Sequence, residues 1–213
     1  MRALVVAKAP VPGRVKTRLG AEVGMQAAAE LAAAALLDTL AACRSAFTDC
    51  HLALDGDLGD AVRSDELERS LTGWTVHRQR GVGLGQRLAH AHADAAGAGP
   101  TVQVGMDTPQ LTSAHLDSVA RAAARGDAVL GPAGDGGWWV LALGDPSAAA
   151  VLADVPMSQP DTFERTRAAL TAAGQTVRTG HELTDVDTAD DAARVAAGLT
   201  GGHFLSAWQS VPV

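Results

Sequence analysis

The amino-terminal part of the chain contains the stretch ALVVAKAPVPGRVKTRL, residues 3–19. Its first part, Ala3–Ala7, is entirely apolar and predicts a buried strand. The part that follows, Lys8–Leu19, carries four cations and no acid, although the net charge of the whole chain is −7. Open parallel sheets bind ligands beyond the carboxyl ends of their strands. The sequence therefore predicts a phosphate-binding loop directly after the first strand.

The composition limits the class of protein. With 213 residues, 47% of them hydrophobic, the chain is interpreted as a single domain, residues 1–213. Aromatic residues contribute only 3%, so Ala, Val and Leu must form the core, which is typical of layered α/β folds. The acidic balance argues against binding to nucleic acid or to anionic membranes. No apolar run approaches the ~20 residues that cross a bilayer, and we expect a soluble, cytoplasmic protein.

Strand and helix patterns alternate along the chain. After the first strand, strands are predicted at residues 51–55, 74–78, 101–105, 127–131, 138–143 and 176–179, and helices at about 24–43, 60–71, 84–96, from 112, at 158–173 and from 188. The short loop Gly134–Gly137 permits antiparallel pairing of the strands on either side of it. The pattern therefore predicts an α/β fold with a mainly parallel, mixed sheet.

Two of the helix starts have the spacing of a capping box. Ser158 precedes Asp161 by three residues, and Thr188 precedes Asp191 by the same spacing. The tail, residues 201–213, is loosely patterned. We expect this tail to pack either on the domain or against a partner, so the sequence leaves a homodimer as one alternative.

The cysteines and histidines give no catalytic pattern. Cys43 and Cys50 belong to no CxxC or Cys/His cluster and are interpreted as core thiols. The sequence has neither HExxH spacing nor a GxSxG elbow, so no nucleophilic triad is predicted. Four histidines are expected on the surface or on helix faces, namely His77, His90, His92 and His115.

Two short motifs carry little weight. Gly81–Gly85 lies between a strand and a helix, but it lacks GxGxxG spacing and does not follow the first strand, so a nicotinamide site is disfavoured. Asp185–Thr188 resembles the DxDxT loop of aspartyl-phosphate phosphatases. That loop follows the first strand in those enzymes, so a covalent phosphatase is also disfavoured.

Four aspartates follow predicted strands or lie in loops beside them: Asp107, Asp135, Asp185 and Asp187. Each has an ordinary structural role available, in a turn or at a helix amino terminus. A mainly parallel sheet, however, could bring several of them to the same edge as Lys8–Leu19. Mg²⁺ is usually held by one or two carboxylates together with substrate phosphates. The combination predicts a metal-nucleotide crevice.

Five motifs follow one another over about residues 2–197, namely Lys8–Leu19, Leu84–Leu88, Gly105–Leu111, Gly131–Trp139 and Asp185–Thr188. With these motifs the chain resembles an uncharacterised bacterial family of MobA-like, or glycosyltransferase-like, proteins. That family is related to the nucleotide-diphospho-sugar transferase (GT-A) superfamily. The resemblance implies a three-layer α/β/α sandwich, which is a Rossmann-like GT-A fold.

The resemblance also implies a set of site residues. Asp107 and Asp187 would hold Mg²⁺ or Mn²⁺, and Asp135, Gly136 and Gly137 would face the acceptor. The first loop and a helix start that borders the nucleotide pocket would supply the nucleotide-binding residues, namely Lys8, Ala9, Pro10, Gly13, Arg14, Lys16, Gly85 and Arg87. Family members commonly carry acids at the positions of Gly83, Gln86 and Gly134, and a Trp at Met157. These departures leave the substrate open.

The residues favour nucleotidyl transfer from a nucleoside triphosphate to a small phosphorylated or hydroxyl acceptor. Cations would hold the departing pyrophosphate, so Lys16 and Arg18 are candidate catalytic residues. Asp107 is the third candidate, as the carboxylate that would hold the metal ion. Related glycosyltransferases usually have an Asp-x-Asp motif where this chain has Gly105–Asp107, with a single carboxylate. A glycosyltransferase that uses a nucleotide-sugar donor and a non-catalytic nucleotide-binding regulatory module remain as alternatives.

Overall fold

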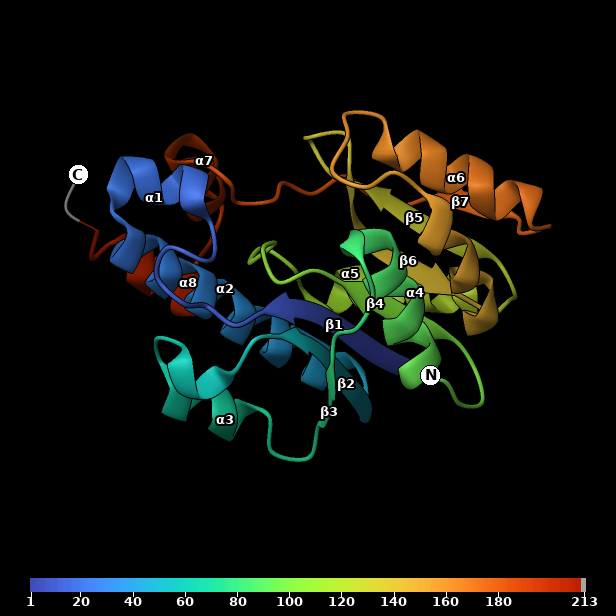
Figure 1. Ribbon diagram of the computed structural model, residues 1–213, viewed down its shortest axis with the longest axis horizontal. Helices are drawn as coiled ribbons and strands as arrows, with labels where there is room; N and C mark the ends of the chain where they lie inside the picture. The colour runs from blue at the N-terminus through green and yellow to red at the C-terminus, as the bar shows by residue number, and fades with distance from the viewer. Residues whose placement is uncertain (212–213) are drawn as a thin grey trace.

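The protein contains one seven-stranded sheet (Figure 1), and its computed structural model describes residues 1–211. The strands are β1 (Arg2–Lys8), β2 (Asp49–Asp55), β3 (Thr75–Arg78), β4 (Thr101–Val104), β5 (Ala128–Pro132), β6 (Trp138–Leu143) and β7 (Val177–Thr179). Their order in the sheet is β3-β2-β1-β4-β6-β5-β7. Strand β6 is antiparallel to β4 and to β5, whereas the other paired strands are parallel. The prediction of a mainly parallel, mixed sheet is confirmed.

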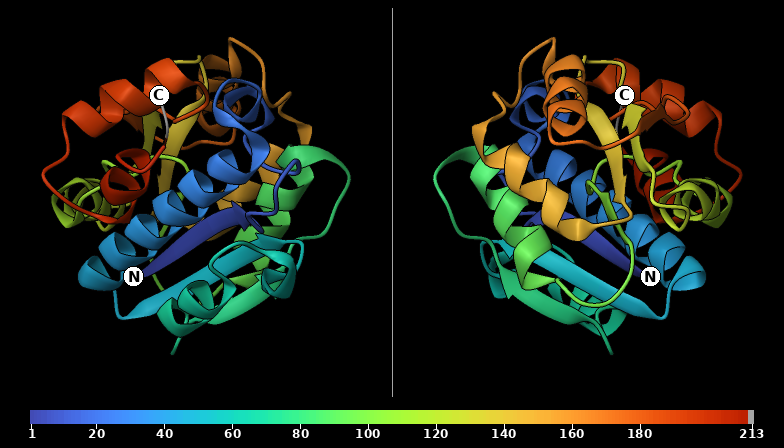
Figure 2. Two further views of the ribbon diagram at one scale, coloured as in Figure 1. Left: turned by 90° about the vertical axis from the view of Figure 1, so that its left-hand side faces the viewer. Right: turned by 90° about the vertical axis from the view of Figure 1, so that its right-hand side faces the viewer.

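Helices cover both faces of this sheet. They are α1 (Thr17–Val23), α2 (Met25–Ala46), α3 (Ser64–Ser70), α4 (Gly83–Asp94), α5 (Ser113–Ala123), α6 (Thr162–Ala172), α7 (Ala189–Ala197) and α8 (His203–Trp208), with 3-10 helices η1 (Leu58–Asp60) and η2 (Pro146–Asp154). Helices α2 and α5 pack on one face, and α4, α6 and η2 pack on the other (Figure 2). The predicted three-layer α/β/α sandwich is therefore confirmed.

The carboxyl-terminal tail packs on its own domain. Phe204 of α8 is fully buried in a cluster with residues of α1, α2 and α7. Asp38 of α2 accepts hydrogen bonds from the backbone N–H groups of His203 and Phe204, at 2.9 and 2.8 Å. The tail thus belongs to the domain as far as it is described, and residues 212–213 lie outside the described residues.

Helix α2 is long and apolar enough to span a membrane by length and composition alone. Its most apolar window has a mean hydropathy of 1.3, but 67% of that window is buried inside the fold. The helix is therefore a core helix of the fold.

Two helix starts differ in how well the sequence predicts them. The capping box of Thr188 and Asp191 is present at the start of α7, as predicted. Ser158, in contrast, caps no helix: its φ is 58°, and α6 begins only at Thr162. The hydroxyl of Thr162 accepts a hydrogen bond from the backbone N–H of Gln159 at 2.9 Å, so the residues before α6 form a turn of their own. Helices α1, α8 and η2 were not predicted.

The buried thiols and one histidine complete the comparison with the sequence. Cys43 and Cys50 are free and buried, as predicted. Of the two positions expected for His92, the surface is wrong, because the residue is only 1% exposed, and the helix face is confirmed. Its position four residues after Leu88 puts it on the face of α4 that packs on the sheet. There its Nε2 donates a hydrogen bond to Gln103 Oε1 at 2.9 Å.

Candidate functional site

The candidate site lies beyond the carboxyl ends of β1 and β4. Strand β1 ends at Lys8, and a loop leads from there to α1 at Thr17. Strand β4 ends at Val104, three residues before Asp107. Because β1 and β4 are adjacent and parallel, the loops that follow them start side by side. The sheet thus brings the basic loop to the first of the candidate aspartates.

Lys16 is the centre of the site. Its backbone is left-handed, with a φ of 44°, and its side chain is only 12% exposed. Its Nζ donates hydrogen bonds to Asp107 Oδ2 and to Asp187 Oδ1, each at 2.7 Å. Arg18 of α1 donates to the other carboxylate oxygen of Asp187 at 2.6 Å. The basic loop and two of the aspartates therefore meet in direct ion pairs.

Backbone hydrogen bonds bring Asp187 to this place from the far end of the chain. The N–H of Val186 donates to the carbonyl oxygen of Asp107 at 2.9 Å. The side-chain amide of Gln110 donates to the carbonyl oxygen of Thr184 at 2.7 Å. The segment before α7 is thus fixed along the loop that follows β4, and the capping box at Thr188 orients the helix that comes next.

Burial and neighbouring charges set the ionisation of this cluster. Burial acts to lower the pKa of Lys16, but the carboxylates of Asp107 and Asp187 outweigh it and raise that pKa above its usual value. The pKa of Asp187 is lowered, because the charge of Lys16 more than offsets burial. Burial, followed by the charge of Asp107, raises the pKa of Asp185 to about 8. The surroundings therefore favour the protonated form of Asp185 and the charged forms of Lys16 and Asp187.

Two cavities adjoin at these ion pairs. The basic cavity, of about 280 Å³, is lined by Lys8, Arg14, Val15, Lys16, Thr17, Arg18, Met106, Asp107 and Asp187. The acidic cavity, of about 490 Å³, is lined among others by the four aspartates Asp107, Asp135, Asp185 and Asp187. Arg18, Met106, Asp107 and Asp187 line both cavities. The site therefore has a cationic side and a carboxylate-rich side. The residues shared by the two cavities include both a cation, Arg18, and two carboxylates, Asp107 and Asp187.

The predicted acceptor loop forms part of the acidic cavity. Asp135 and Gly137 line it, and Asp135 Oδ1 accepts a hydrogen bond from the backbone N–H of Gly137 at 2.8 Å. Gly136 does not line it but has a φ of 87°, and a Cβ at this position would lie 2.0 Å from the carbonyl oxygen of Pro160. Gly136 therefore allows the loop to contact the segment before α6, which also contributes to the lining of the acidic cavity.

The first-loop residues that the sequence assigned to nucleotide binding divide into two groups. Lys8, Arg14 and Lys16 line the basic cavity. Ala9 and Pro10 are buried beneath the loop, and Gly13 is exposed with a φ of 75°. These three residues shape the loop, whereas the cations are the groups that can reach a phosphate.

Gly85 and Arg87 of α4 line neither cavity. A Cβ on Gly85 would lie 2.3 Å from the carbonyl oxygen of Leu152, so this glycine permits close packing of α4 on η2. Arg87 donates a hydrogen bond to Asp55 Oδ2 at 2.7 Å, at the carboxyl end of β2. In this structure both residues therefore have structural contacts away from the two cavities.

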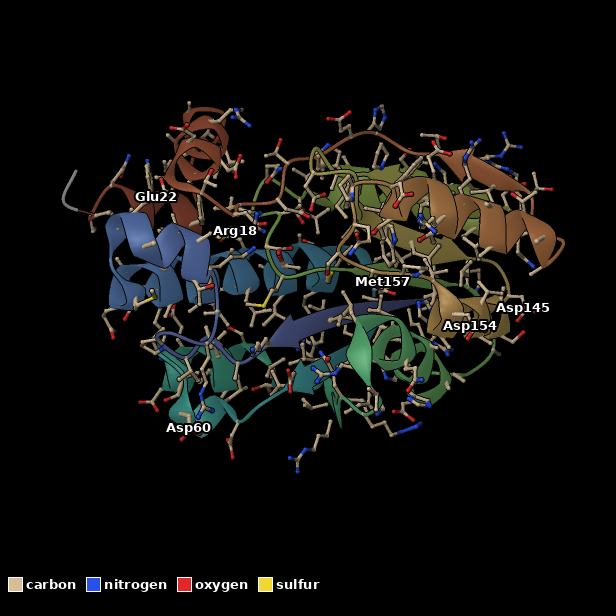
Figure 3. All side chains as sticks on the ribbon, turned by 45° about the horizontal axis from the view of Figure 1, so that its top comes forward. Arg18, Glu22, Asp60, Asp145, Asp154 and Met157 are labelled. Carbon is tan, nitrogen blue, oxygen red and sulfur yellow. The ribbon has the colours of Figure 1, made fainter. Side chains whose placement is uncertain are left out.

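Sequence reasoning missed several residues that line the acidic cavity. Gln103 points to it from β4, Trp138 from β6, and Leu88 from α4. Arg18 of α1 and Met157, which precedes α6, also line this cavity and come from separate segments of the fold (Figure 3). Trp138 lay within a recognised motif, but nothing in its spacing separated a cavity residue from a core residue.

The chemistry of the donor groups fits a hard divalent cation. Carboxylate oxygens are the ligands that Mg²⁺ and Mn²⁺ take, and one or two of them suffice when phosphates supply the rest. Asp107 and Asp187 face the same point, which Lys16 Nζ occupies. Asp185 Oδ1, close by, is buried without a hydrogen-bond partner. Among residues 1–211, no group of three or more His, Cys, Asp or Glu side chains has the geometry of a metal site, so phosphate oxygens would have to complete the coordination.

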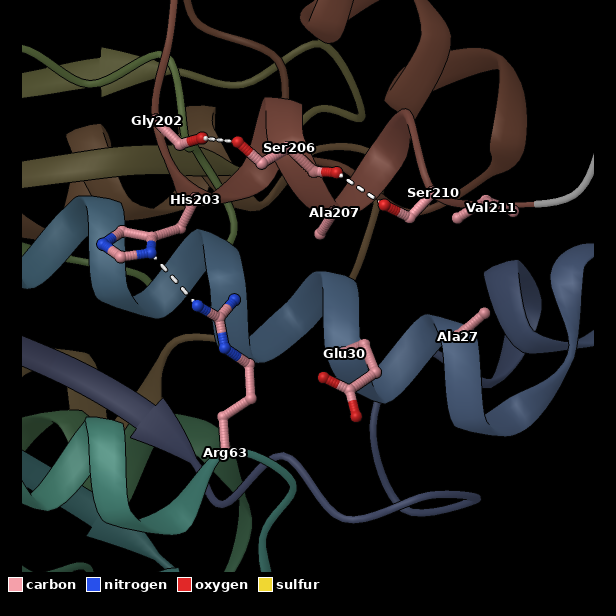
Figure 4. Close-up of a pocket in the computed structure, with 9 residues that line it drawn as sticks. All are labelled: Ala27, Glu30, Arg63, Gly202, His203, Ser206, Ala207, Ser210 and Val211. Atoms are coloured by element: carbon pink, nitrogen blue, oxygen red, sulfur yellow. Dashed lines mark hydrogen bonds between the residues drawn. The ribbon is translucent and has the colours of Figure 1, made fainter.

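A larger cavity, of about 730 Å³, lies elsewhere, between α2, α8 and Arg63 (Figure 4). Several of its polar groups have partners. Arg63 contacts Glu66 and His203, Ser206 Oγ donates to the carbonyl oxygen of Gly202 at 3.0 Å, and Glu30 accepts a hydrogen bond from Gln26 at 3.1 Å. Arg63 and Glu30 both line this cavity, but within residues 1–211 neither forms part of a cluster in which one cation contacts two carboxylates, as Lys16 does.

Solved structures similar to this one include proteins named as transferases. A protein from Desulfovibrio desulfuricans G20, provisionally named a nucleotide-diphospho-sugar transferase, is 26% identical with a TM-score of 0.84, over 98% of this chain and 92% of that chain. A nucleotidyl transferase from Methanothermobacter thermautotrophicus is 22% identical with a TM-score of 0.62, over 97% and 98% of the two chains. A Mycobacterium tuberculosis H37Rv protein in complex with manganese is 19% identical with a TM-score of 0.57, over 93% and 99%.

These similarities confirm the predicted fold, and the similarity to the Desulfovibrio protein bears out the superfamily and the expected general class, a transferase. The two neighbours below 25% identity support the fold alone. A search of curated proteins gave no match. A family model matches residues 36–159, which is more than half of the chain. The chain belongs to this family, described as uncharacterised proteins conserved in bacteria (DUF2064).

Proposed function

We propose that the protein is a Mg²⁺- or Mn²⁺-dependent nucleotidyltransferase. It would move a nucleoside monophosphate from a nucleoside triphosphate to a small acceptor with a phosphate or a hydroxyl group, and release pyrophosphate. The observation that carries the proposal is the ion-paired cluster of Lys16, Asp107 and Asp187 between the basic and the acidic cavity. The proposal includes a cytoplasmic location, with no nucleic acid or membrane as partner.

The charges suggest how the substrates would lie. A triphosphate carries several negative charges, and four cations line the basic cavity that could bind it, namely Lys8, Arg14, Lys16 and Arg18. The acidic cavity would repel the same group, so it is the better place for the acceptor, and it favours one that presents a hydroxyl group over one that presents a phosphate. The reacting phosphate would then lie at the boundary, next to Asp107 and Asp187, which line both cavities.

Each group of the chain would have a defined task there. Lys16 and Arg18 would bind phosphate oxygens and neutralise the charge that develops on the departing pyrophosphate. Asp107 and Asp187 would hold the divalent ion, which, when bound, supplies a Lewis acid that polarises phosphate oxygens. Asp135 and Gly137, which line the acidic cavity, would orient the acceptor there. Catalysis would thus depend on positioning and on charge neutralisation.

A thermal-shift screen tests the proposal directly. The full chain is heated with each nucleoside triphosphate and with nucleotide sugars, with and without Mg²⁺. We expect a triphosphate to raise the melting temperature, more strongly with Mg²⁺ than without, because a ligand that binds only the folded state stabilises it. Pyrophosphate release from the same triphosphate, with a panel of acceptors, would then establish the transfer.

Glycosyl transfer is the second candidate, favoured by the similarity to the Desulfovibrio protein over nearly the whole chain. It predicts stabilisation by a nucleotide sugar and release of a nucleoside diphosphate or monophosphate instead of pyrophosphate. Tight nucleotide binding without any product across a broad acceptor panel would instead identify a regulatory module.

A further inference from the structure

The chain contains only two lysines, Lys8 and Lys16, beside fifteen arginines; Lys8 ends β1, and Lys16 lies on the loop that follows it. Lys16 is the more buried of the cations in this cluster, with a side chain 12% exposed against 75% for Arg18. It is also the cation that contacts both Asp107 and Asp187. Its ammonium group therefore occupies the point from which a divalent ion would contact both carboxylates.

We propose that Lys16 is a resident counter-cation that excludes free divalent metal from the site and leaves the two carboxylates only when phosphate groups bind. Metal would then enter together with the nucleotide and not alone. This inference rests on the proposed function, because it assigns the order in which that site takes its ligands. It makes Lys16 a residue that determines specificity for the metal-nucleotide complex over the free ion.

The geometry makes competition between Lys16 and a metal ion unavoidable. Each carboxylate gives one oxygen to Lys16 Nζ in a charge-assisted hydrogen bond of 2.7 Å. A divalent ion between Asp107 and Asp187 would lie beside the positive ammonium group unless Lys16 moved. Because the cluster is largely buried, that repulsion is weakly screened. Free metal would thus have to break two ion pairs without offering Lys16 a new partner.

Phosphate groups would supply that new partner. Lys16 lines the basic cavity together with Lys8 and Arg14, so an anion there lies within reach of its side chain. A lysine has a flexible stem of four carbons and a compact charge, and it can redirect its ammonium group by rotating side-chain bonds. Arg18 cannot replace it, since Arg18 contacts Asp187 alone and is mostly exposed. Lys16 can therefore exchange carboxylates for phosphates while the backbone stays in place.

Binding of Mn²⁺ alone, followed by electron paramagnetic resonance, is the first test. We expect the affinity of Lys16→Met for free Mn²⁺ to exceed that of the wild type by about tenfold or more, because removal of the ammonium group leaves two neighbouring carboxylates without a counter-charge. Arg14→Met is the matched control, since Arg14 lines the same cavity and forms no ion pair with these aspartates. It should bind Mn²⁺ as the wild type does. Equal Mn²⁺ affinity of the wild type and Lys16→Met would overturn the inference.

A second test uses the wild-type chain and needs no variant to fold. Selective ¹⁵N labelling of lysine gives side-chain signals from Lys8 and Lys16 alone. We expect the Lys16 Nζ signal to stay unchanged on addition of Mg²⁺ and to shift when tripolyphosphate is added without metal. A shift with Mg²⁺ alone, or none with tripolyphosphate, would overturn the inference. If the Lys16 signal behaves as expected with both Mg²⁺ and tripolyphosphate, but the protein converts no nucleotide, the inference about Lys16 holds and the proposed transfer reaction is rejected.

Discussion

The backbone N–H of Val186 donates a hydrogen bond to the carbonyl oxygen of Asp107 at 2.9 Å. This bond joins the loop after β4 to the segment before α7, and each of the two carries one of the carboxylates that contact Lys16. The spacing of Asp107 and Asp187 therefore depends on the main chain as well as on their ion pairs. Distortion of this contact should affect the site even though neither carboxylate changes.

Val186→Pro tests that dependence, because proline has no N–H to donate. We expect a loss of about 1–3 kcal/mol in the free energy of unfolding, typical of a buried acceptor left without its donor, together with loss of stabilisation by Mg²⁺-triphosphate. Val186→Ala is the matched control: it keeps the N–H and removes only buried side-chain atoms. If both variants lose stability equally and both still respond to ligand, the hydrogen bond does not position Asp187.

Asp107→Asn should weaken Mg²⁺-dependent nucleotide binding, since it removes a negative charge from the pair that faces Lys16. Calorimetry with and without Mg²⁺ measures the effect, which we expect to be about tenfold or more in the metal-dependent affinity. Asp60→Asn changes an exposed aspartate of η1, away from both cavities, and should bind as the wild type does. Unchanged metal-dependent affinity in Asp107→Asn would show that the metal site has been assigned to the wrong carboxylate.

Gly85→Ala distinguishes a structural glycine from a nucleotide-binding one. The added Cβ would lie 2.3 Å from the carbonyl oxygen of Leu152, so α4 and η2 would have to separate. We expect a loss of about 1–3 kcal/mol in the free energy of unfolding, as for other overpacked sites, with little change in nucleotide affinity. Gly198→Ala is the control, because its Cβ would have only an ordinary contact at 3.6 Å with the carbonyl oxygen of Val195. Normal stability with weakened nucleotide binding would restore Gly85 to the nucleotide site.

Sequence patterns predicted those parts of the fold that local chemistry determines. The apolar run before Lys8 became β1, and the capping box at Thr188 became the start of α7, because each depends on residues close together in the chain. Ser158 had similar local spacing, but its left-handed backbone and the turn at Thr162 depend on packing against the loop that contains Gly136. Contacts of that kind leave no periodic signal in the sequence.

The site was predictable as a set of residues and not as an arrangement. Strand order places the loops after β1 and β4 together, so the convergence of Lys16 with Asp107 follows from the predicted parallel sheet. That Lys16 lies between the two carboxylates, instead of opposite them across a crevice, depends on its left-handed backbone and on the bond between Val186 and Asp107. The packing role of Gly85 likewise depends on η2, which the sequence did not reveal.

His92 gives the fold a pH-dependent stability that its variants can isolate. Burial lowers its pKa from 6.5 to about 4, and the hydrogen bond to Gln103 only partly opposes this shift. The folded protein therefore binds fewer protons here than the unfolded chain, so the contribution of His92 is complete above pH 6.5 and is lost as the pH falls toward about 4. A shift of this size corresponds to about 3 kcal/mol.

His92→Gln should remove this dependence while its amide keeps a donor for Gln103. Denaturant unfolding of the wild type and the variant is measured at several values between pH 7.5 and pH 4. We expect the wild type to lose about 3 kcal/mol more than the variant over this range, since other titrating groups contribute equally to both. Parallel pH profiles would mean that His92 can be protonated inside the fold without cost, and would contradict its assignment as a neutral, buried group that is hydrogen-bonded to Gln103.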